Sequence, residues 1–151
     1  MQRGSFSAAR QVLDQALRDE PRNHELRDAM VKVLSTIGQS QGDSANLPAA
    51  LEAFTQAVAL VPEDFESLAN LGLTQLRMAN RDAALTTLQR ALVVRPNEVR
   101  VLNLVAELQF RRREFSAARD LLQRSLAARP AQPRIAAMLK DVDSILKSEA
   151  R

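Results

Sequence analysis

Few residues of this 151-residue chain could do chemistry, and the string Gly38-Gln-Ser-Gln-Gly42 comes closest to an enzyme motif. It reads G-x-S-x-G, the nucleophile elbow, in which a serine on a strand-to-helix turn attacks an acyl group with the help of a His later in the chain. The sole His, His24, precedes Ser40, and a helix is expected before the string. We therefore place Ser40 in a polar loop between helices and predict no catalytic residue.

The composition leaves little with which to bind a metal or a cofactor. With no Cys and one His, the chain cannot build a Cys-based zinc site or a His pair, and its four Gly contain no phosphate-binding pattern. We therefore predict no metal and no cofactor. No window approaches the roughly 18 apolar residues of a membrane span, and no signal-peptide core is present, so a cytoplasmic location is the default expectation.

The charge is unevenly distributed along the chain. Residues 1–75 carry a net charge of −4 and residues 76–151 one of +7. A basic half can attract an acidic partner or the acidic half of another copy. The run Arg111-Arg112-Arg113 raises nucleic acid as a ligand, but Tyr and Trp are absent and acidic residues such as Glu107 and Glu114 interleave with the arginines. These features favour a protein or peptide partner over nucleic acid, and the basic half makes an acidic partner a candidate.

Four prolines mark an internal repeat, because Pro21, Pro62, Pro96 and Pro130 stand at sequence intervals of 41, 34 and 34. Small and large apolar residues recur at fixed distances before each proline, and they lie on one face of a helix that ends before the proline. Small residues on such a face let a second helix approach closely. The four sets are Ala9, Leu13 and Ala16; Ala50, Phe54 and Ala57; Ala84, Leu88 and Ala91; and Ala118, Leu122 and Ser125.

A further helix precedes this one in the two later copies. This helix is recognised by two large apolar residues followed by a small one, and the pattern recurs after 34 residues. The two sets are Leu68, Leu71 and Gly72, and Leu102, Val105 and Ala106. Together with the prolines, these motifs resemble the tetratricopeptide repeat family, whose unit is a 34-residue helix–turn–helix, over nearly the whole chain. The resemblance implies an all-α, right-handed solenoid of antiparallel helix pairs, in which the first helices line a concave groove for a peptide or partner protein.

The repeat columns divide a single predicted domain, 1–151, into five parts. These are the second helix of an incomplete repeat (1–22), three repeats (23–64, 65–98 and 99–132) and a capping helix (133–151). The 41-residue spacing of the first full repeat contains seven extra residues, which we place in a mobile polar loop at about 38–47. Helices are predicted near 6–19, 23–37, 48–60, 65–78, 82–94, 98–111, 116–128 and 133–147.

The resemblance also implies which residues bind the partner, namely those beside the core columns of the first helices. The spacing of the residues agrees: on each of the two helices predicted near 65–78 and 98–111, the binding residues follow one stripe that is offset from the core stripe. Amides would bond a peptide backbone, arginines would pair with carboxylates, and apolar residues would anchor side chains. The alternative is that these residues simply face solvent, or that Phe110 is core. The predicted residues are Glu66, Ala69, Asn70, Leu73, Arg77, Arg100, Asn103, Glu107, Phe110 and Arg111.

Some family members bind a chaperone's C-terminal carboxylate through a clamp of basic residues and asparagines on successive first helices. Here Asn70 and Arg100 fall in matching columns, but Leu104 and Asp28 stand where basic residues are expected. The clamp is incomplete, so this ligand is not predicted.

The N-terminal stripe of Phe6, Ala9, Leu13 and Ala16 has no first helix before it. Either the chain is a fragment of a longer array or another copy covers the stripe, which makes these residues candidates for self-association. We predict a scaffold or adaptor module that binds protein and is not an enzyme. The alternatives are a regulatory or substrate-recruiting segment of a larger enzyme, or a self-associating assembly module.

Overall fold

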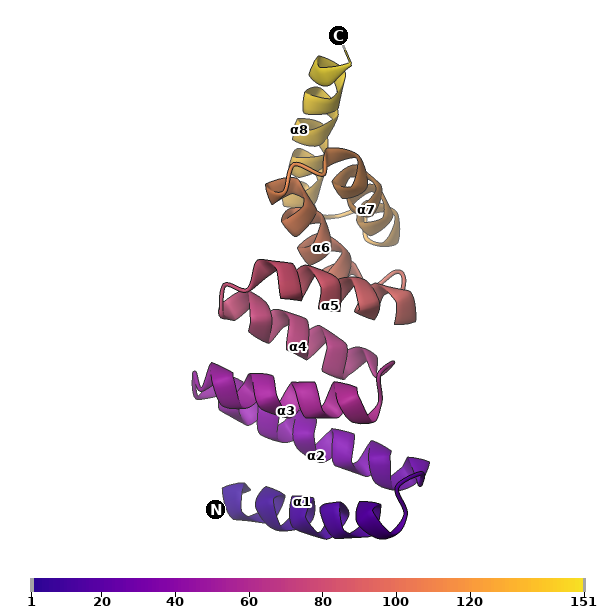
Figure 1. Cartoon of the computed structure of the whole chain (residues 1–151). Coiled ribbons are helices and arrows are strands. Elements are labelled where there is room, and N and C mark those ends of the chain that lie inside the picture. The colour runs from indigo at the N-terminus through magenta and orange to yellow at the C-terminus, as the bar shows by residue number, and fades with distance from the viewer. Residues whose placement is uncertain (1, 151) are drawn as a thin grey trace. The chain divides into compact units, whose positions relative to one another are not determined.

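The computed structural model describes the backbone of residues 2–150 and the side chains of residues 6–150; Met1 and Arg151, the ends of the predicted domain, lie outside the described residues. Every regular element in this range is an α-helix, and consecutive helices run antiparallel within each unit (Figure 1), so the predicted fold class of antiparallel helix pairs is confirmed. The helices are α1 (Gln2–Asp19), α2 (His24–Asp43), α3 (Leu47–Leu60), α4 (Phe65–Arg77), α5 (Arg81–Val94), α6 (Val99–Arg111), α7 (Phe115–Ala128) and α8 (Pro133–Glu149).

The chain divides into two compact units, residues 1–87 and 88–151, with the division inside α5. In the first unit, α2 packs against α1, α3 and α4, and α3 also packs against α4. In the second unit, α7 packs against both α6 and α8. Sequential neighbours therefore supply the core of each unit, as expected where helices are joined by short connections.

Three turns within the helix pairs share one conformation. Each has three residues, and its central residue has a positive φ: 59° at Ala45, 61° at Ala79 and 63° at Arg113. At the second turn the Ala79 amide donates to the Leu76 carbonyl and the Asn80 amide to the Gln75 carbonyl, which closes a Schellman motif. Equivalent bonds surround Ala45 and Arg113. Because none of the three is glycine, the helix pairs impose a backbone conformation that these residues do not favour.

The predicted loop at 38–47 is wrong, because α2 continues to Asp43. This helix has 20 residues, whereas α4 and α6 each have 13. The seven extra residues therefore form about two additional helical turns, which leaves the buried face of the helix in register. Glycine and polar residues favour a loop in isolation, but here the packing of α2 against α3 decides the conformation.

The register of α2 shows that the additional turns lie toward its start. Counting from Pro21, as the 41-residue spacing suggests, places the first-helix signature on Arg27, Met30, Val31 and Leu34. Counting back one 34-residue repeat from Leu68, Leu71 and Gly72 places it instead on Leu34, Ile37 and Gly38.

Gly38 then corresponds to Gly72, the small residue of the later first helix. A Cβ built on Gly38 would lie 2.7 Å from the nearest ring atom of Phe54, so the ring of α3 fills the space that a side chain at position 38 would need. Gly42, one turn later, is also buried. The G-x-S-x-G string is therefore a small-residue packing surface within a helix, and Ser40 does not lie on a nucleophile elbow.

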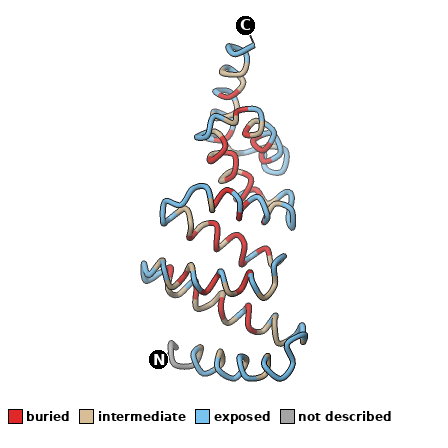
Figure 2. The backbone as a smooth tube through the Cα atoms, viewed as in Figure 1, coloured by how far each residue is buried: buried red, intermediate tan, exposed pale blue. Residues whose placement is uncertain are grey.

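Burial shows where the helix pairs are complete (Figure 2). The repeat residues that precede Pro62 and Pro130 are at most 3% exposed in α3 and α7; they are Ala50, Phe54 and Ala57, and Ala118, Leu122 and Ser125. By contrast, α1 has no buried residue among its described side chains, 6–19. Its Leu13 and Leu17 are only partly buried, against a cluster formed by Met30, Val31, Leu34 and Ala57.

Candidate functional site

The predicted binding residues divide between α4 and α6, which belong to different units, so each surface is described by itself. On α4, Glu66 and Arg77 are exposed and Asn70 and Leu73 are partly exposed, whereas Ala69 is buried. The start of α4 is fixed by Asp64, whose carboxylate accepts a hydrogen bond of 2.8 Å from the Ser67 amide. The α4 surface therefore presents a carboxylate, an amide, a leucine and a guanidinium, without Ala69.

Arg77 reaches from α4 to the end of α2. Its Nη2 donates to the Gly42 carbonyl at 3.1 Å, in the last turn of α2. Carbonyls at a helix C-terminus carry partial negative charge, so a guanidinium there is favourable. Arg77 thus joins α4 to the end of the lengthened α2.

Asn103 of α6 is engaged inside the second unit. The Ser125 hydroxyl donates to its Oδ1 at 2.6 Å, and its Nδ2 donates to Gln132 Oε1 at 2.8 Å. Gln132 in turn donates to the Ser125 carbonyl, 3.1 Å away, and Ser125 is fully buried. Asn103 therefore ties α6 to the end of α7 and the start of α8, and it retains one N–H for a ligand.

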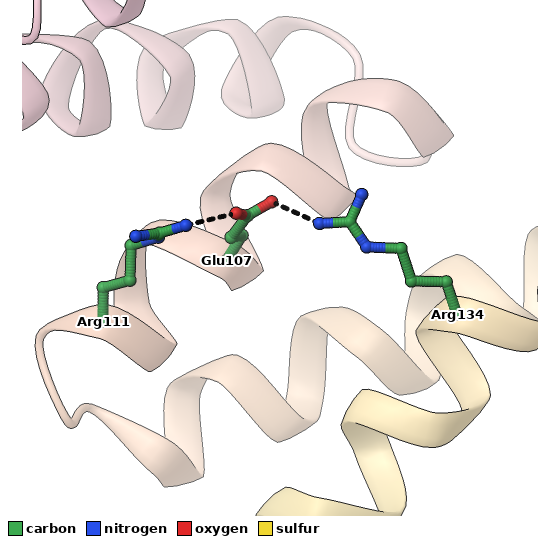
Figure 3. A network of polar contacts seen from close by, with 3 residues as sticks. All are labelled: Glu107, Arg111 and Arg134. Atoms are coloured by element: carbon green, nitrogen blue, oxygen red, sulfur yellow. Dashed lines mark hydrogen bonds and ion pairs between the residues drawn. The ribbon is translucent and has the colours of Figure 1, made fainter.

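Glu107 of α6 joins two guanidinium groups from different helices (Figure 3). Its Oε1 lies 2.9 Å from Arg111 Nη2, and its Oε2 lies 3.4 Å from Arg134 Nη2 of α8. The side chains of Arg111 and Arg134 are 58% and 78% exposed, against 31% for Glu107. Two positive charges around one negative charge leave this cluster net positive and open to solvent, which suits a second carboxylate.

Phe110 is partly core and partly surface. Its ring meets that of Phe115 edge-to-face, with centroids 5.5 Å apart and planes at 68°. Phe115 is 9% exposed, while Phe110 is partly exposed at the end of α6. Arg100, at the other end of α6, is exposed. The α6 surface therefore runs from Arg100 past Asn103 and Glu107 to an apolar edge at Phe110 beside Arg111.

Comparison with known proteins identifies the family. A family profile described as tetratricopeptide repeat matches residues 36–78 and 70–133, which is more than half of the chain. The chain belongs to the tetratricopeptide repeat (TPR) family. The predicted family resemblance is thus confirmed, and no curated protein matches the sequence itself.

Solved TPR structures match with TM-scores near 0.7. A crystal structure of MamA has a TM-score of 0.72 and 22% identity, over 77% of this chain and 64% of that one, so this TPR chain spans less than two thirds of it. The Yersinia enterocolitica type III secretion chaperone SycD, in complex with a peptide of the translocator YopD, has a TM-score of 0.67 and 21% identity, over 78% of this chain and 93% of that one. The second TPR domain of human RPAP3, in complex with the HSP70 peptide SGPTIEEVD, has a TM-score of 0.69 and 12% identity, over 78% of this chain and 98% of that one. At these identities the likeness shows the fold alone.

Two features of this TPR chain were not predicted from the sequence: the role of Arg134 and the register of the clamp column. Arg134 was assigned to a capping helix, although it stands one repeat length after Arg100 in the same column, and that spacing was the available signal. Likewise, the 34-residue register moves the clamp column of Asp28 to Ser35, which is not basic either, so the carboxylate clamp stays incomplete. None of the helices in residues 2–150 is long and apolar enough to cross a membrane.

Proposed function

We propose that this TPR chain is a protein-binding scaffold or adaptor that receives a peptide or partner protein on its first-helix surfaces, and that the α6 surface selects acidic partners. The observation that carries the proposal is the Glu107 cluster, in which Arg111 and Arg134 present guanidinium groups around a single carboxylate. The peptide complexes of SycD and RPAP3, the latter with a peptide that ends in IEEVD, support a peptide ligand for this fold.

The surface is formed before the ligand arrives. Asn103, Ser125 and Gln132 join the three helices of the second unit by hydrogen bonds of 2.6–3.1 Å, and Glu107 orients both arginines. A rigid receptor loses less conformational freedom on binding than a flexible one. A ligand carboxylate would then bind the outward N–H groups of the two guanidiniums, while the exposed edge of Phe110 contacts an apolar side chain.

We also propose that the chain has no catalytic activity of its own. Ser40, the residue in the only enzyme-like string, lies within α2, and its carbonyl accepts a hydrogen bond from the Ser44 hydroxyl of the following turn at 2.9 Å. A helical serine of this kind lacks the exposed turn and oxyanion hole that acyl transfer requires.

Charge reversal on α6 and α8 tests the binding proposal. A fluorescent octapeptide of alternating Glu and Ala serves as the probe, with its Gln-containing counterpart as reference, and binding is followed by anisotropy. We expect Arg111→Glu with Arg134→Glu to weaken binding of the acidic peptide by at least about tenfold, and the preference to fade with added salt. The matched control, Arg90→Glu with Arg129→Glu, changes the net charge equally on α5 and at the end of α7, and should retain most of the affinity.

Equal losses in the two double variants would mean that only net charge matters, and unchanged binding in the α6 and α8 variant would place the site elsewhere. Circular dichroism of both variants checks that helical content is unaltered. The same pair of variants, used in affinity capture with mass spectrometry, then identifies partners whose capture depends on Arg111 and Arg134.

A further inference from the structure

Glu107 stands between the two guanidinium groups of the α6 surface. Arg111 approaches its carboxylate from one side and Arg134 from the other, each through Nη2 (Figure 3). The contacts of 2.9 and 3.4 Å, with the width of a carboxylate between them, place the two Nη2 atoms at most about 8.5 Å apart. The two positive charges therefore have a defined separation, and a negative charge lies between them.

The charge of Glu107 limits how a ligand carboxylate can use both arginines. A lone carboxylate that contacted both guanidiniums at once would lie beside the carboxylate of Glu107, which already joins them. Like charges repel at short range, and the Glu107 side chain is only 31% exposed, so water screens this repulsion incompletely. Two ligand carboxylates, each on the outer side of one guanidinium, avoid most of the repulsion.

The second unit can accept the additional negative charge. Residues 88–151 contain 13 Lys and Arg and 7 Asp and Glu, a net charge of +6. Such a charge attracts anionic ligands and offsets the repulsion between two bound carboxylates.

The separation of the two arginines matches alternate residues of an extended peptide. Successive residues of a strand point to opposite faces, and residues i and i+2 share a face roughly 6.6 Å apart. With an acidic pair at i and i+1, one of the two side chains would point away from α6. A helical ligand would instead place residues i and i+4 on one face.

Asn103 favours an extended ligand over a helical one. It lies one helical turn before Glu107 on the same stripe of α6 and retains one N–H beyond its bonds to Ser125 and Gln132. The carbonyls of an extended backbone are available to accept from this N–H, whereas those of a helix are bonded within the helix.

We infer that Glu107 determines the specificity of the α6 surface, and that it selects extended segments with acidic residues at i and i+2. Segments with one acidic residue, or with two adjacent ones, bind less tightly. The residue between the two acidic positions points away from α6, so its type is unrestricted. This inference rests on the proposed function, because it requires that an acidic peptide binds at Arg111 and Arg134.

Capped octapeptides of two Glu and six Ser test the spacing, because they share composition and charge. The Glu residues stand at i and i+2, at i and i+1, or at i and i+4, and a fourth peptide has a single Glu. Each is titrated into the full chain, and NMR signals of the Arg111 and Arg134 side chains report binding at the site. We expect the i and i+2 peptide to bind about three- to fivefold more tightly than the other pairs, the scale of one exposed ion pair.

Glu107→Gln tests the cause of the preference. The variant removes the central negative charge at nearly constant size, so a lone carboxylate can approach both arginines. The single-Glu peptide should bind about threefold more tightly to it than to the parent, and the preference for i and i+2 should disappear. A purely structural role of Glu107 would not raise this affinity.

Glu114→Gln is the matched control. Glu114 also pairs with an arginine, at 2.8 Å from Arg112 Nε, and it lies outside the Arg111 and Arg134 pair. The control changes the net charge equally and should keep the preference of the parent. Circular dichroism checks that both variants retain their helical content.

The outcomes separate this inference from the proposed function. Equal affinities of the two-Glu peptides, or a preference for i and i+4, with a response at Arg111 and Arg134, would overturn the inference and leave the proposed function standing. Equal shifts of all affinities in Glu107→Gln and Glu114→Gln would also overturn it, since only net charge would then matter. If no peptide binds, or if Arg111 and Arg134 do not respond, both the inference and the proposed function are wrong.

Discussion

Two buried glycines on one face of α2 predict opposite effects of the same substitution. Replacing Gly by Ala inside a helix usually stabilises it by about 0.5–1 kcal/mol. At Gly38, however, the new Cβ would lie 2.7–2.9 Å from three ring atoms of Phe54, whose side chain is 3% exposed and cannot withdraw. At Gly42 the nearest atoms are Arg77 Nη1 at 3.4 Å and Ala50 Cβ at 4.0 Å, which are acceptable contacts.

The magnitudes decide the sign at each position. Overpacking a core costs about 1–3 kcal/mol, so Gly38→Ala should be destabilising by about 1 kcal/mol after the helix-propensity gain. Gly42→Ala should be stabilising by about 0.5–1 kcal/mol, because nothing offsets that gain. Urea denaturation followed by circular dichroism at 222 nm measures both. If the two substitutions stabilise equally, α2 and α3 do not approach at Gly38 as the structure shows.

Removing the ring tip tests the cause. Phe54→Leu takes away the atoms that the Gly38→Ala methyl would meet, so the double variant should be more stable than the two single effects predict when added. A coupling energy of about 1 kcal/mol is expected for residues in direct contact. A coupling near zero would show that the cost at Gly38 has another origin.

Other positions give further tests by the same denaturation assay. Ala79→Gly should stabilise by about 0.5–1 kcal/mol, because it relieves a left-handed backbone at 61°, whereas Ala83→Gly, inside α5, should destabilise by a similar amount; equal effects would contradict the turn geometry. Gln109→Met should stabilise by about 1 kcal/mol, since Gln109 is 7% exposed and its Oε1 has no hydrogen-bond partner among the described residues; the exposed Gln89→Met should change little. Asn103→Ala should destabilise by about 1–2 kcal/mol by removing its bonds to Ser125 and Gln132, and an unchanged midpoint would return Asn103 to the ligand surface alone.

The helix pairs were predictable because their information is periodic. Small residues at Ala84 and Ala91 with Leu88 between them specify a face, and a proline limits the helix, so both existence and pairing follow from spacing. The 34-residue spacing also gives the signature of α2, but two glycines and several polar residues near its end favoured a loop over the helix that the structure has. Gly38 and Gly42 lower helix propensity locally, and only the buried contact with Phe54, on the next helix, reverses that preference.

The binding role of the α6 residues stays a prediction, but the structure shows which of their contacts the sequence pattern could not give. Spacing placed Asn103 and Glu107 on one stripe of α6, but their partners come from later helices and connections, at Ser125, Gln132 and Arg134. Hydrogen bonds between elements depend on how the helices pack, and a periodic pattern contains no information about them. Two residues of one stripe therefore have different roles: Asn103 joins the helices of the second unit, while Glu107 holds the guanidinium groups of Arg111 and Arg134 at the surface.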